Sequence, residues 1–379
     1  MRPAESDGSG AADGEWSGAH APLSVALSDT HATQTHAVQT HAALTHAALS
    51  DAHATLVCDD NTAPFAALGG GAPELVVGTR PGDWAEVAAC AARGGVVAAA
   101  LGWHPWFLLE PRFCAAGVAQ LEQALTADAR LQVGECGLDH AFEPRGGPHP
   151  RRCARAAADA SCPCQRCVRE VQRAALGAQL ALAARLGRCA SLHCVRAHGA
   201  LLDALAACDA RWPPALNLHA WSGSPEVTRQ LLRTPGLGPR LFFGTCAHVN
   251  LRSLALATWQ RGADGRWRSG PALADKPWRL AAAPWAAFCA RMLAIPPDRV
   301  LLESDLCARR PALGAEEGGR ACARVAALEL VAEVCADALQ LDVRELQLAA
   351  RRNLTRFLAM AAPGATAPAA GPGREYICK

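Results

Sequence analysis

The chain has 379 residues, of which 51% are hydrophobic and 19% charged, so it carries enough apolar material for a large core and is not disordered as a whole. Its 37 Lys and Arg residues against 35 Asp and Glu residues give a formal net charge of +2, which excludes a global attraction to nucleic acid and leaves only local polyanion sites. No apolar run reaches the ~20 residues that span a bilayer, and the start lacks the apolar segment of a signal peptide. We therefore expect an intracellular protein of the cytoplasm or nucleus, with no membrane partner.

The first 48 residues read as a low-complexity tail. They are rich in Gly, Ala and Ser and contain a Thr-His-Ala repeat with four histidines spaced five apart, namely His31, His36, His41 and His46. A period of five matches neither a helix nor a strand, so we interpret the repeat as a disordered tract rather than a metal-binding arm. The segment 27–33 is nearly repeated at 49–55, and either copy could supply a first strand. We expect the second copy to do so, because it runs directly into sequence typical of a folded domain.

From residue 49 onward, short β-prone runs alternate with longer helical patterns, which is typical of a parallel sheet with crossover helices. Eight such runs occur: Leu49–Val57, Glu74–Thr79, Gly95–Trp103, Leu131–Leu138, Cys189–Val195, Pro214–Ala220, Leu241–Cys246 and Arg299–Ser304. Eight is the number of strands that closes an α/β barrel. The sequence therefore predicts a (β/α)₈ TIM barrel over residues 49–360.

Three of the segments between or after these runs are predicted to form helices. The first, Val168–Leu186, places apolar residues at spacings of three and four. Two more helices, Val325–Leu339 and Val343–Met360, are expected after the last strand. The Ala-, Pro- and Gly-rich residues 361–379 are predicted to form a flexible tail.

Side chains that can bind metal stand at or just past the ends of the predicted strands. They are Asp51, His53, His104, Glu135, Asp139, His193, His219 and Asp305. All strand carboxyl ends of a barrel open on one face, so these side chains should converge on one pocket. Imidazole and carboxylate are the ligands expected of a zinc, manganese or mixed nitrogen and oxygen site.

Each of these residues also has a purely structural explanation. A single His beside a strand can be an ordinary hydrogen-bonded residue, and Asp305 could cap the following helix. Glu135, however, is an acid inside an otherwise apolar strand, and a buried carboxylate needs a partner. We therefore favour a metal site for the group as a whole.

Several of these segments resemble the successive motifs of the TatD family of metal-dependent deoxyribonucleases, in the family's order. The matching segments are Gly102-Trp-His-Pro105, Gly134-Glu-Cys-Gly-Leu-Asp139, Leu192-His-Cys-Val-Arg196, Leu218-His-Ala-Trp-Ser-Gly-Ser224 and Leu302-Glu-Ser-Asp305. The resemblance spans about Ser50 to Leu358 and includes Gln172 and Gln179. The segment that follows His193 looks most like the fungal and algal branch of the family.

The resemblance implies one or two divalent ions, Mg, Mn or Zn, in a hydrolase of the metal-dependent barrel type. The implied metal ligands are His53, Glu135 as a bridge, His193, His219 and Asp305. The implied catalytic residues are Asp305, as a general base, and Glu135. The residues implied to contact substrate are His104, Trp106, Arg196, Ser222 and Ser224, since a guanidinium and backbone N–H groups suit phosphate oxygens.

Two positions depart from the family's pattern. Where the family's first motif has His-x-His, this chain has Thr55 two residues after His53, and a hydroxyl binds such metals poorly. Where the family has a second His in its His-Pro-His motif, this chain has Trp106, which is expected to remove a polar group at the pocket mouth and add an apolar surface. Base stacking and plain packing are equally open roles for Trp106.

A Cys- and Arg-rich insertion occupies about residues 143–167. It contains His149, Cys153, Cys162, Cys164 and Cys167. These residues could hold structural zinc, but the spacing fits no standard zinc ribbon or finger. We favour an irregular surface loop. The other cysteines are expected to be reduced core thiols, because the total of 17 is odd and no export signal accompanies it.

Three classes of function fit these features. The first is metal-assisted hydrolysis of phosphodiesters, most plausibly in DNA, a substrate that comes from the resemblance alone. The second keeps the hydrolase but gives it a small phosphoester, amide or lactone, which suits a near-neutral chain with an apolar pocket mouth. The third is an interaction protein whose barrel persists with a degraded metal site, for which Thr55 is the best argument.

Overall fold

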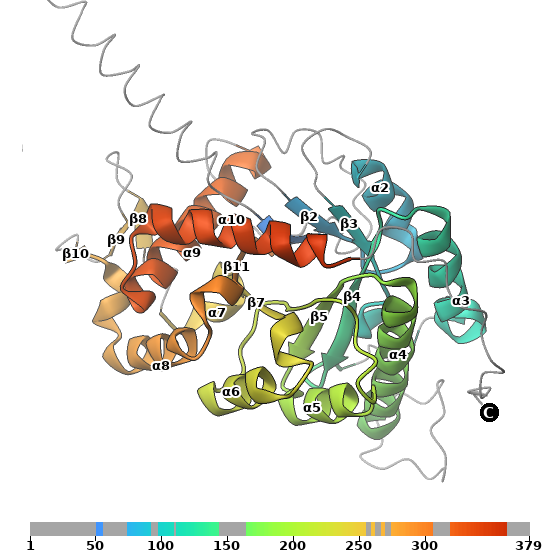
Figure 1. Ribbon diagram of the computed structural model, residues 1–379. Helices are drawn as coiled ribbons and strands as arrows, with labels where there is room; N and C mark the ends of the chain where they lie inside the picture. The colour runs from blue at the N-terminus through green and yellow to red at the C-terminus, as the bar shows by residue number, and fades with distance from the viewer. Residues whose placement is uncertain are drawn as a thin grey trace, which may run out of the picture. The chain divides into compact units, whose positions relative to one another are not determined.

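Within the described residues, one sheet of eight parallel strands forms the centre of the fold (Figure 1). The strands are β1 (Asp51–Thr55), β2 (Glu74–Val77), β3 (Ala98–Leu101), β4 (Gln132–Asp139), β5 (Ala190–Val195), β6 (Leu216–Leu218), β7 (Leu241–Cys246) and β11 (Val300–Glu303). They follow one another in chain order, and β11 lies beside β1, which brings the two edges of the sheet together. The predicted α/β barrel architecture is therefore confirmed, with the second copy of the repeated segment supplying β1.

The structure is a computed structural model. It describes residues 51–55, 74–91, 98–109, 111–143, 164–254, 259–261, 267–269, 274–305 and 319–361. All of them belong to one unit of the chain, Leu44–Lys379. The predicted tails at 1–48 and 361–379 and most of the insertion at 143–167 fall outside the described residues, so their boundaries stay predictions.

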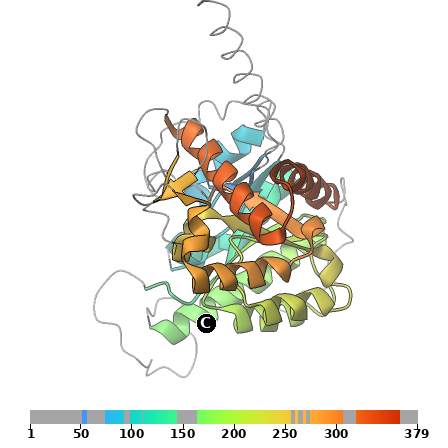
Figure 2. The ribbon, with the colours of Figure 1, turned by 90° about the vertical axis from the view of Figure 1, so that its left-hand side faces the viewer.

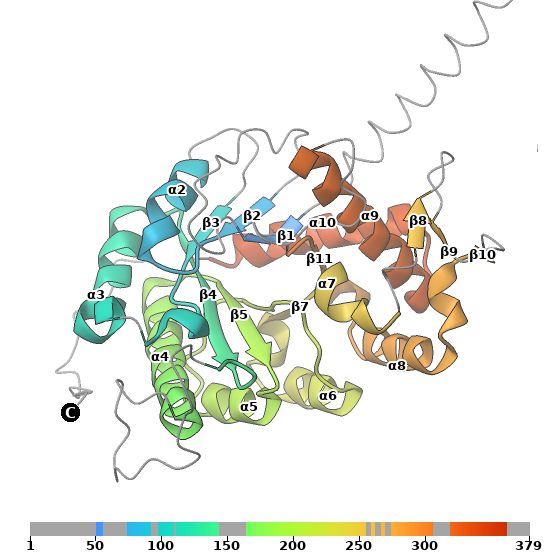
Figure 3. The ribbon, with the colours of Figure 1, turned by 180° about the vertical axis from the view of Figure 1, so that it is seen from behind.

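Helices are arranged around the sheet (Figures 2 and 3). They are α2 (Pro81–Ala91), α3 (Pro111–Ala127), α4 (Gln165–Leu186), α5 (His198–Ala206), α6 (Pro225–Arg233), α7 (Ala247–Asn250), α8 (Ala282–Leu293), α9 (Gly319–Leu339) and α10 (Val343–Ala359). Short 3₁₀ turns occur at η1 (Pro105–Phe107), η2 (Gly238–Arg240), η3 (Arg252–Leu254), η5 (Pro277–Leu280) and η6 (Pro297–Arg299). The three helices predicted from the sequence are α4, α9 and α10. None of the helices in these ranges is long and apolar enough to cross a bilayer.

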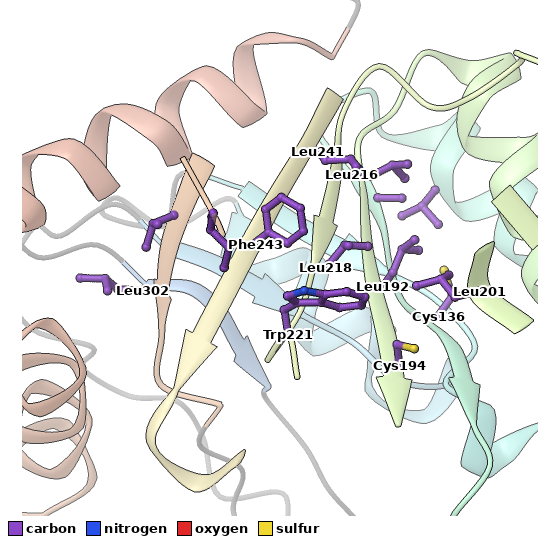
Figure 4. Packing of buried hydrophobic residues seen from close by; sticks show 14 of the residues in the cluster. Cys136, Leu192, Cys194, Leu201, Leu216, Leu218, Trp221, Leu241, Phe243 and Leu302 are labelled. Carbon is purple, nitrogen blue, oxygen red and sulfur yellow. The ribbon is translucent and has the colours of Figure 1, made fainter. Parts of the chain in front are cut away.

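Both faces of the strands are buried, as a parallel sheet covered by helices requires. Successive residues in β7 show this directly, since Phe243 packs toward the helices while Phe242 belongs to a second, separate apolar cluster. Figure 4 shows Phe243 in the first of these clusters. Phe357 of α10 meets Phe242 edge to face, with ring centroids 5.5 Å apart. Helix α10 thus packs against the second cluster, which lies at the opposite end of the strands from the polar residues singled out above.

Helix α4 fixes the carboxyl ends of β3 and β4 through two fully buried glutamines, Gln172 and Gln179. Gln179 accepts from the backbone N of Trp103 at 2.8 Å and donates to its carbonyl at 3.2 Å. Gln172 makes the same pair of bonds to Asp139, at 3.0 and 3.1 Å. The two side chains are seven residues apart, so they share one face of the helix. Each side-chain amide bonds one backbone N–H and one backbone C=O, as a neighbouring strand would. The backbone groups that the sheet leaves unpaired at these positions are satisfied in this way.

A second, smaller sheet follows η3 and is antiparallel. Its strands are β8 (Trp259–Arg261), β9 (Trp267–Ser269) and β10 (Ala274–Asp275). The sequence analysis did not predict it, because its strands are only two or three residues long. The chain after β10 is fastened to α9 by Asp337, which accepts from Arg279 Nε at 2.7 Å and from Trp278 Nε1 at 2.8 Å.

Replacing Gln179 by Leu should lower the free energy of unfolding by about 2–4 kcal/mol. The substitution preserves volume but leaves the buried backbone N–H and C=O of Trp103 without partners, and each unpaired group costs about 1–3 kcal/mol. Urea unfolding of the two proteins measures the difference. The matched control is Gln123→Leu on the exposed face of α3. An equal loss of unfolding free energy in the two variants would show that the hydrogen bonds of Gln179 to Trp103 contribute nothing to stability.

Candidate functional site

A cavity of about 220 Å³ opens where the parallel strands end. Its lining comes from the carboxyl ends of β2 through β7 and of β11: Thr79, His104, Trp106, Phe107, Glu135, Asp139, His193, Cys194, Val195, His219, Ala220, Val249 and Asp305. Six of the eight metal-capable residues named from the sequence are therefore in one place. Side chains more than 200 residues apart in the chain meet here because each follows a strand of the same barrel.

Glu135 lies at the centre of this cavity and is only 4% exposed. Its Oε1 is 2.8 Å from Nδ1 of His193, 3.4 Å from Nε2 of His104 and 3.9 Å from Nε2 of His219. A carboxylate removed from water is costly unless positive charge or hydrogen-bond donors surround it. Three imidazoles supply that environment, so the sequence-based expectation of a partner for this buried acid is confirmed.

The second ring nitrogen of His193 faces another carboxylate. Nε2 lies 3.4 Å from Oδ2 of Asp139, so the ring stands between Glu135 and Asp139. Burial opposes a charge on the ring, yet the two carboxylates outweigh it and raise the pKa of His193 to about 9. A carboxylate behind the far nitrogen is the arrangement that fixes the orientation of metal-binding histidines.

Asp139 is held in turn by Trp106, whose indole Nε1 donates to Oδ2 at 2.6 Å. The backbone N of Ala141 donates to Oδ1 at 2.8 Å. Burial disfavours the charged form of Asp139, but the bonds from His193 and Trp106 hold its pKa below the usual value. Trp106 thus keeps one polar atom, an indole N–H that can only donate, and Asp139 accepts from it.

His219 has its own carboxylate partner, Glu303 of β11, which is fully buried. Nδ1 of His219 lies 3.0 Å from Glu303 Oε2, and the same oxygen accepts from the backbone N of Ala220 at 2.9 Å. Asn217 donates to Oε1 at 2.8 Å. Burial opposes a charge on His219, but Glu303 and Asp305 overcome it and raise the pKa to about 10. This arrangement directs Nε2 of His219 toward Glu135.

Sequence reasoning missed Glu303 as a functional residue. The signal was present, since Glu303 is an acid within the apolar strand Leu301–Glu303, just as Glu135 is within β4. Gly244 of β7 makes room for it: a Cβ at this position would stand 1.9 Å from Oε1 of Glu303. The glycine is therefore required by the close approach of the carboxylate and not by any turn.

His104 differs from the other two histidines. Its Nδ1 accepts a hydrogen bond from the backbone N of Trp106 at 3.2 Å, so in a neutral ring the hydrogen resides on Nε2, which faces Glu135. Burial lowers the pKa of His104, which favours this neutral form. His104 is thus placed as a donor to Glu135 in preference to a metal ligand.

Asp305 follows β11 and adopts a left-handed backbone with φ of 46°. Its Oδ1 lies 3.5 Å from Nε2 of His219, and its Oδ2 accepts from the thiol of Cys246 at 3.7 Å. Two further residues at strand ends, Arg196 and Ala220, also have positive φ, at 52° and 43°. Backbone conformations of this kind collect at functional sites.

The donor set at this end of the barrel fits a divalent cation. Ligand atoms of His104, Glu135 and His193 lie within 4.8 Å of one another. Because Nδ1 of His104 is tied to Trp106, the atoms that best fit a cation are Oε1 of Glu135, Nδ1 of His193 and Nε2 of His219. Each of the two imidazoles has a carboxylate behind its other nitrogen, which fixes the orientation of the ring. One carboxylate and two imidazoles suit zinc or manganese better than an ion that prefers oxygen ligands alone.

The other predicted site residues stand as follows. His53 and Thr55 are in β1, but only the backbone of this strand is described, so the consequence of Thr55 remains a prediction. Arg196 and Ser222 are exposed and do not line the cavity, and Ser222 Oγ lies 3.5 Å from His198 Nε2. Ser224 caps α6 by accepting from Val227 N. Contacts of Arg196, Ser222 and Ser224 with substrate stay predictions.

Only the end of the Cys-rich insertion is described. Cys164 and Cys167 are buried, and Cys164 caps α4 by accepting from the backbone N of Cys167 at 3.4 Å. His149, Cys153 and Cys162 lie outside the described residues. The choice between structural zinc and a surface loop therefore stays open.

The fold and this site together define an α/β barrel protein with a carboxylate and imidazole centre at the carboxyl ends of its strands. The family model described as TatD related DNase matches residues 33–252, which is more than half of the chain. The chain belongs to this TatD family.

Two kinds of relative accompany the family match. The chain is 37% identical over 108 residues to the 3'-5' ssDNA/RNA exonuclease TatD of Edwardsiella piscicida, a match that covers 28% of this chain and about a third (33%) of that protein. The crystal structure of a TatD homologue from Escherichia coli matches with a TM-score of 0.53 and 21% identity, over 83% of this chain and 98% of that one. An amidohydrolase from Saccharomyces cerevisiae gives 14% identity and a TM-score of 0.48, over 82% of this chain and 99% of that one. The Escherichia coli structure supports the barrel fold.

Gly244→Ala should weaken metal binding by about 10- to 100-fold, the usual cost of disturbing a residue that orients a metal ligand. The new methyl group displaces the carboxylate of Glu303 and so releases His219. Calorimetric titration with Zn²⁺ or Mn²⁺ measures the affinity. Gly177→Ala is the control, because a Cβ there has nothing within 4 Å. Unchanged affinity in Gly244→Ala would mean that Glu303 does not orient the ligand.

Metal affinity should rise with pH until the pH reaches about 9 to 10, where the two histidines lose their protons without a metal. With pKa values raised to about 9 and about 10, His193 and His219 both hold a proton at neutral pH in the metal-free protein, and a cation must displace these protons. Binding should release about one to two protons per ion, measured by calorimetry in buffers of different ionisation heat. An affinity independent of pH, without proton release, would contradict the arrangement.

Proposed function

We propose that this protein is a metal-dependent hydrolase that cleaves phosphodiester bonds, with DNA as its substrate. The observation that carries the proposal is the buried carboxylate of Glu135 with His193 at 2.8 Å and His219 at 3.9 Å, at the floor of an open cavity. Membership of the TatD related DNase family supports the reaction class. The nucleic-acid substrate is supported by the exonuclease of Edwardsiella piscicida, of which this chain matches only a third.

In the proposed reaction, the residues of the cavity have separate roles as metal ligands, general base and positioning group. Glu135, His193 and His219 would hold the cation, and Asp305, whose Oδ1 lies 3.5 Å from Nε2 of His219, would be a further ligand. A divalent cation at this place would make water more acidic and polarise a phosphoryl oxygen. Asp305 accepts the proton of the attacking water on its carboxylate. His104 donates from Nε2 toward Glu135 and keeps that carboxylate in place.

Substrate contacts are assigned to residues at the same end of the barrel. Arg196 is exposed where β5 ends and offers a guanidinium to phosphate oxygens outside the cavity. Ser222 and Ser224 follow β6 and precede the N-terminus of α6, where hydroxyl and backbone N–H groups suit an anion. With a net charge of only +2, local contacts of this kind must supply the affinity for a polyanion.

A second substrate class is favoured by the size of the cavity. At about 220 Å³ the cavity is smaller than the 300–1,000 Å³ of typical ligand pockets, and Phe107 and Val249 add apolar walls. A small phosphoester, amide or lactone would fit such a space as well as one end of a strand would. The two classes differ in whether a long substrate raises the rate.

The test is cleavage of labelled single- and double-stranded DNA, beside small esters and amides, with and without added Mg²⁺, Mn²⁺ or Zn²⁺. Glu135→Gln and Asp305→Asn should each lower the metal-dependent rate by about 10²- to 10⁴-fold, because each removes one charge from the centre. Glu345→Gln on the exposed start of α10 is the control and should keep the parent's rate.

Three outcomes separate the candidate functions. DNA cleavage that is lost in both site variants supports the proposal. Turnover of small esters without cleavage of DNA would reject DNA as the substrate and support the second substrate class. Metal uptake by Thr55→His but not by the folded parent, with no turnover from the parent, would reject the hydrolase and favour a barrel kept for binding a partner.

A further inference from the structure

Two aromatic rings, one at the cavity and one stacked on it, have faces that the chemistry described above does not use. Trp106 lines the cavity and is 38% exposed, which is high for a tryptophan. Phe142 is partly buried and stacks with it, with ring centroids 6.5 Å apart and planes inclined by 19°. Two aromatic rings side by side make a continuous apolar surface next to a cavity with polar groups, and ligand sites combine these two features.

The indole of Trp106 and the backbone of Phe142 are both held in place before any ligand arrives. The indole N–H of Trp106 donates to Asp139 Oδ2 at 2.6 Å, and its backbone N donates to His104 Nδ1 at 3.2 Å. Phe142 follows the turn that Asp139 organises, and its carbonyl accepts from Gln165 Nε2 at 3.1 Å. A ring that is already ordered loses little conformational freedom when a ligand stacks on it.

The ring of Trp106 is close to the candidate metal ligands. The ring centroid of Trp106 lies 6.3 Å from that of His193, and the two planes are inclined by 72°. A flat group resting on Trp106 is therefore beside the centre without covering it. A nucleotide has this layout, because its base and its phosphate are separated by a single sugar. Base stacking on an aromatic side chain also needs no particular sequence, since every base has a π face.

We propose that Trp106 and Phe142 form a stacking subsite for one unpaired terminal nucleobase, whose phosphate lies at Glu135 and His193. This inference rests on the proposed function and names the part of the substrate that the site recognises. The base must be unpaired, because a cavity of about 220 Å³ cannot admit a duplex end. Stacking also supplies affinity that a chain with a net charge of +2 lacks.

The first test uses the parent protein alone. Its affinity for a short labelled single-stranded DNA is measured by fluorescence anisotropy in buffer with a metal chelator, which prevents cleavage. Two probes of equal length carry an abasic residue at the 5' or the 3' end. One of them should bind roughly 5- to 150-fold more weakly than the intact strand. Equal binding of all three probes would overturn the proposal.

The second test removes the ring. Trp106→Leu should weaken binding of the intact strand by the same factor as the abasic end does and should leave binding of the abasic probe unchanged. Trp106→Phe keeps a ring and should retain most of the affinity, and Phe142→Leu should lose part of it. Trp285→Leu is the control, because Trp285 stacks on Phe288 in a similar geometry on the remote helix α8. Equal losses for the intact and abasic probes in Trp106→Leu would contradict a stacking role, and if that variant does not fold, Phe142→Leu answers the same question.

Binding and cleavage are measured separately, so the stacking subsite and the nuclease activity can be rejected independently. Binding that depends on the terminal base, without any metal-dependent cleavage, would leave the subsite standing and reject the nuclease. Cleavage at equal rates of strands with intact and abasic ends, together with equal binding of them, would leave the hydrolase standing and reject the subsite.

Discussion

The arrangement of the site depends on the burial of one carboxylate. Glu135 is removed from water at the centre of the barrel mouth. Its negative charge there would cost much free energy unless positive charge or hydrogen-bond donors surround it. Protons on His193 and His219 provide that compensation in the metal-free protein, and a cation can replace them. The same electrostatic requirement thus explains the raised pKa values, the convergence of three histidines and the suitability of the centre for a metal.

The imidazoles are oriented by structure outside the centre. Asp139 stands behind His193, and Glu303 stands behind His219, so each ring is held by a carboxylate on its outer nitrogen. Neither carboxylate is free to turn, since that of Asp139 is held by Trp106 and by the backbone N of Ala141, and Glu303 fits only because Gly244 has no side chain. A centre built in this way keeps its geometry while the ion or the substrate is absent, which is the condition for rapid electrostatic catalysis.

Most of the barrel and of its centre could be predicted from the sequence. The eight strands, the choice of the second repeat copy for β1 and the convergence of Glu135, His193, His219 and Asp305 follow from alternation and from acids placed in apolar runs. The small sheet β8–β10 could not, because two- and three-residue strands carry no period. The donor role of Trp106 was also out of reach, since its partner Asp139 is 33 residues away and only the folded chain brings them together. Glu303 was within reach of the reasoning that found Glu135.

Helix α4 has a consequence for the mouth of the barrel as a whole. Side-chain bonds from Gln165, Gln172 and Gln179 to the backbone at and just beyond the ends of β3 and β4 set its register against the barrel. One helix therefore fixes two neighbouring strand ends, which carry His104 and Asp139. A substitution that shifts α4 would move both ends together, so this side of the centre would be displaced as one unit relative to His219.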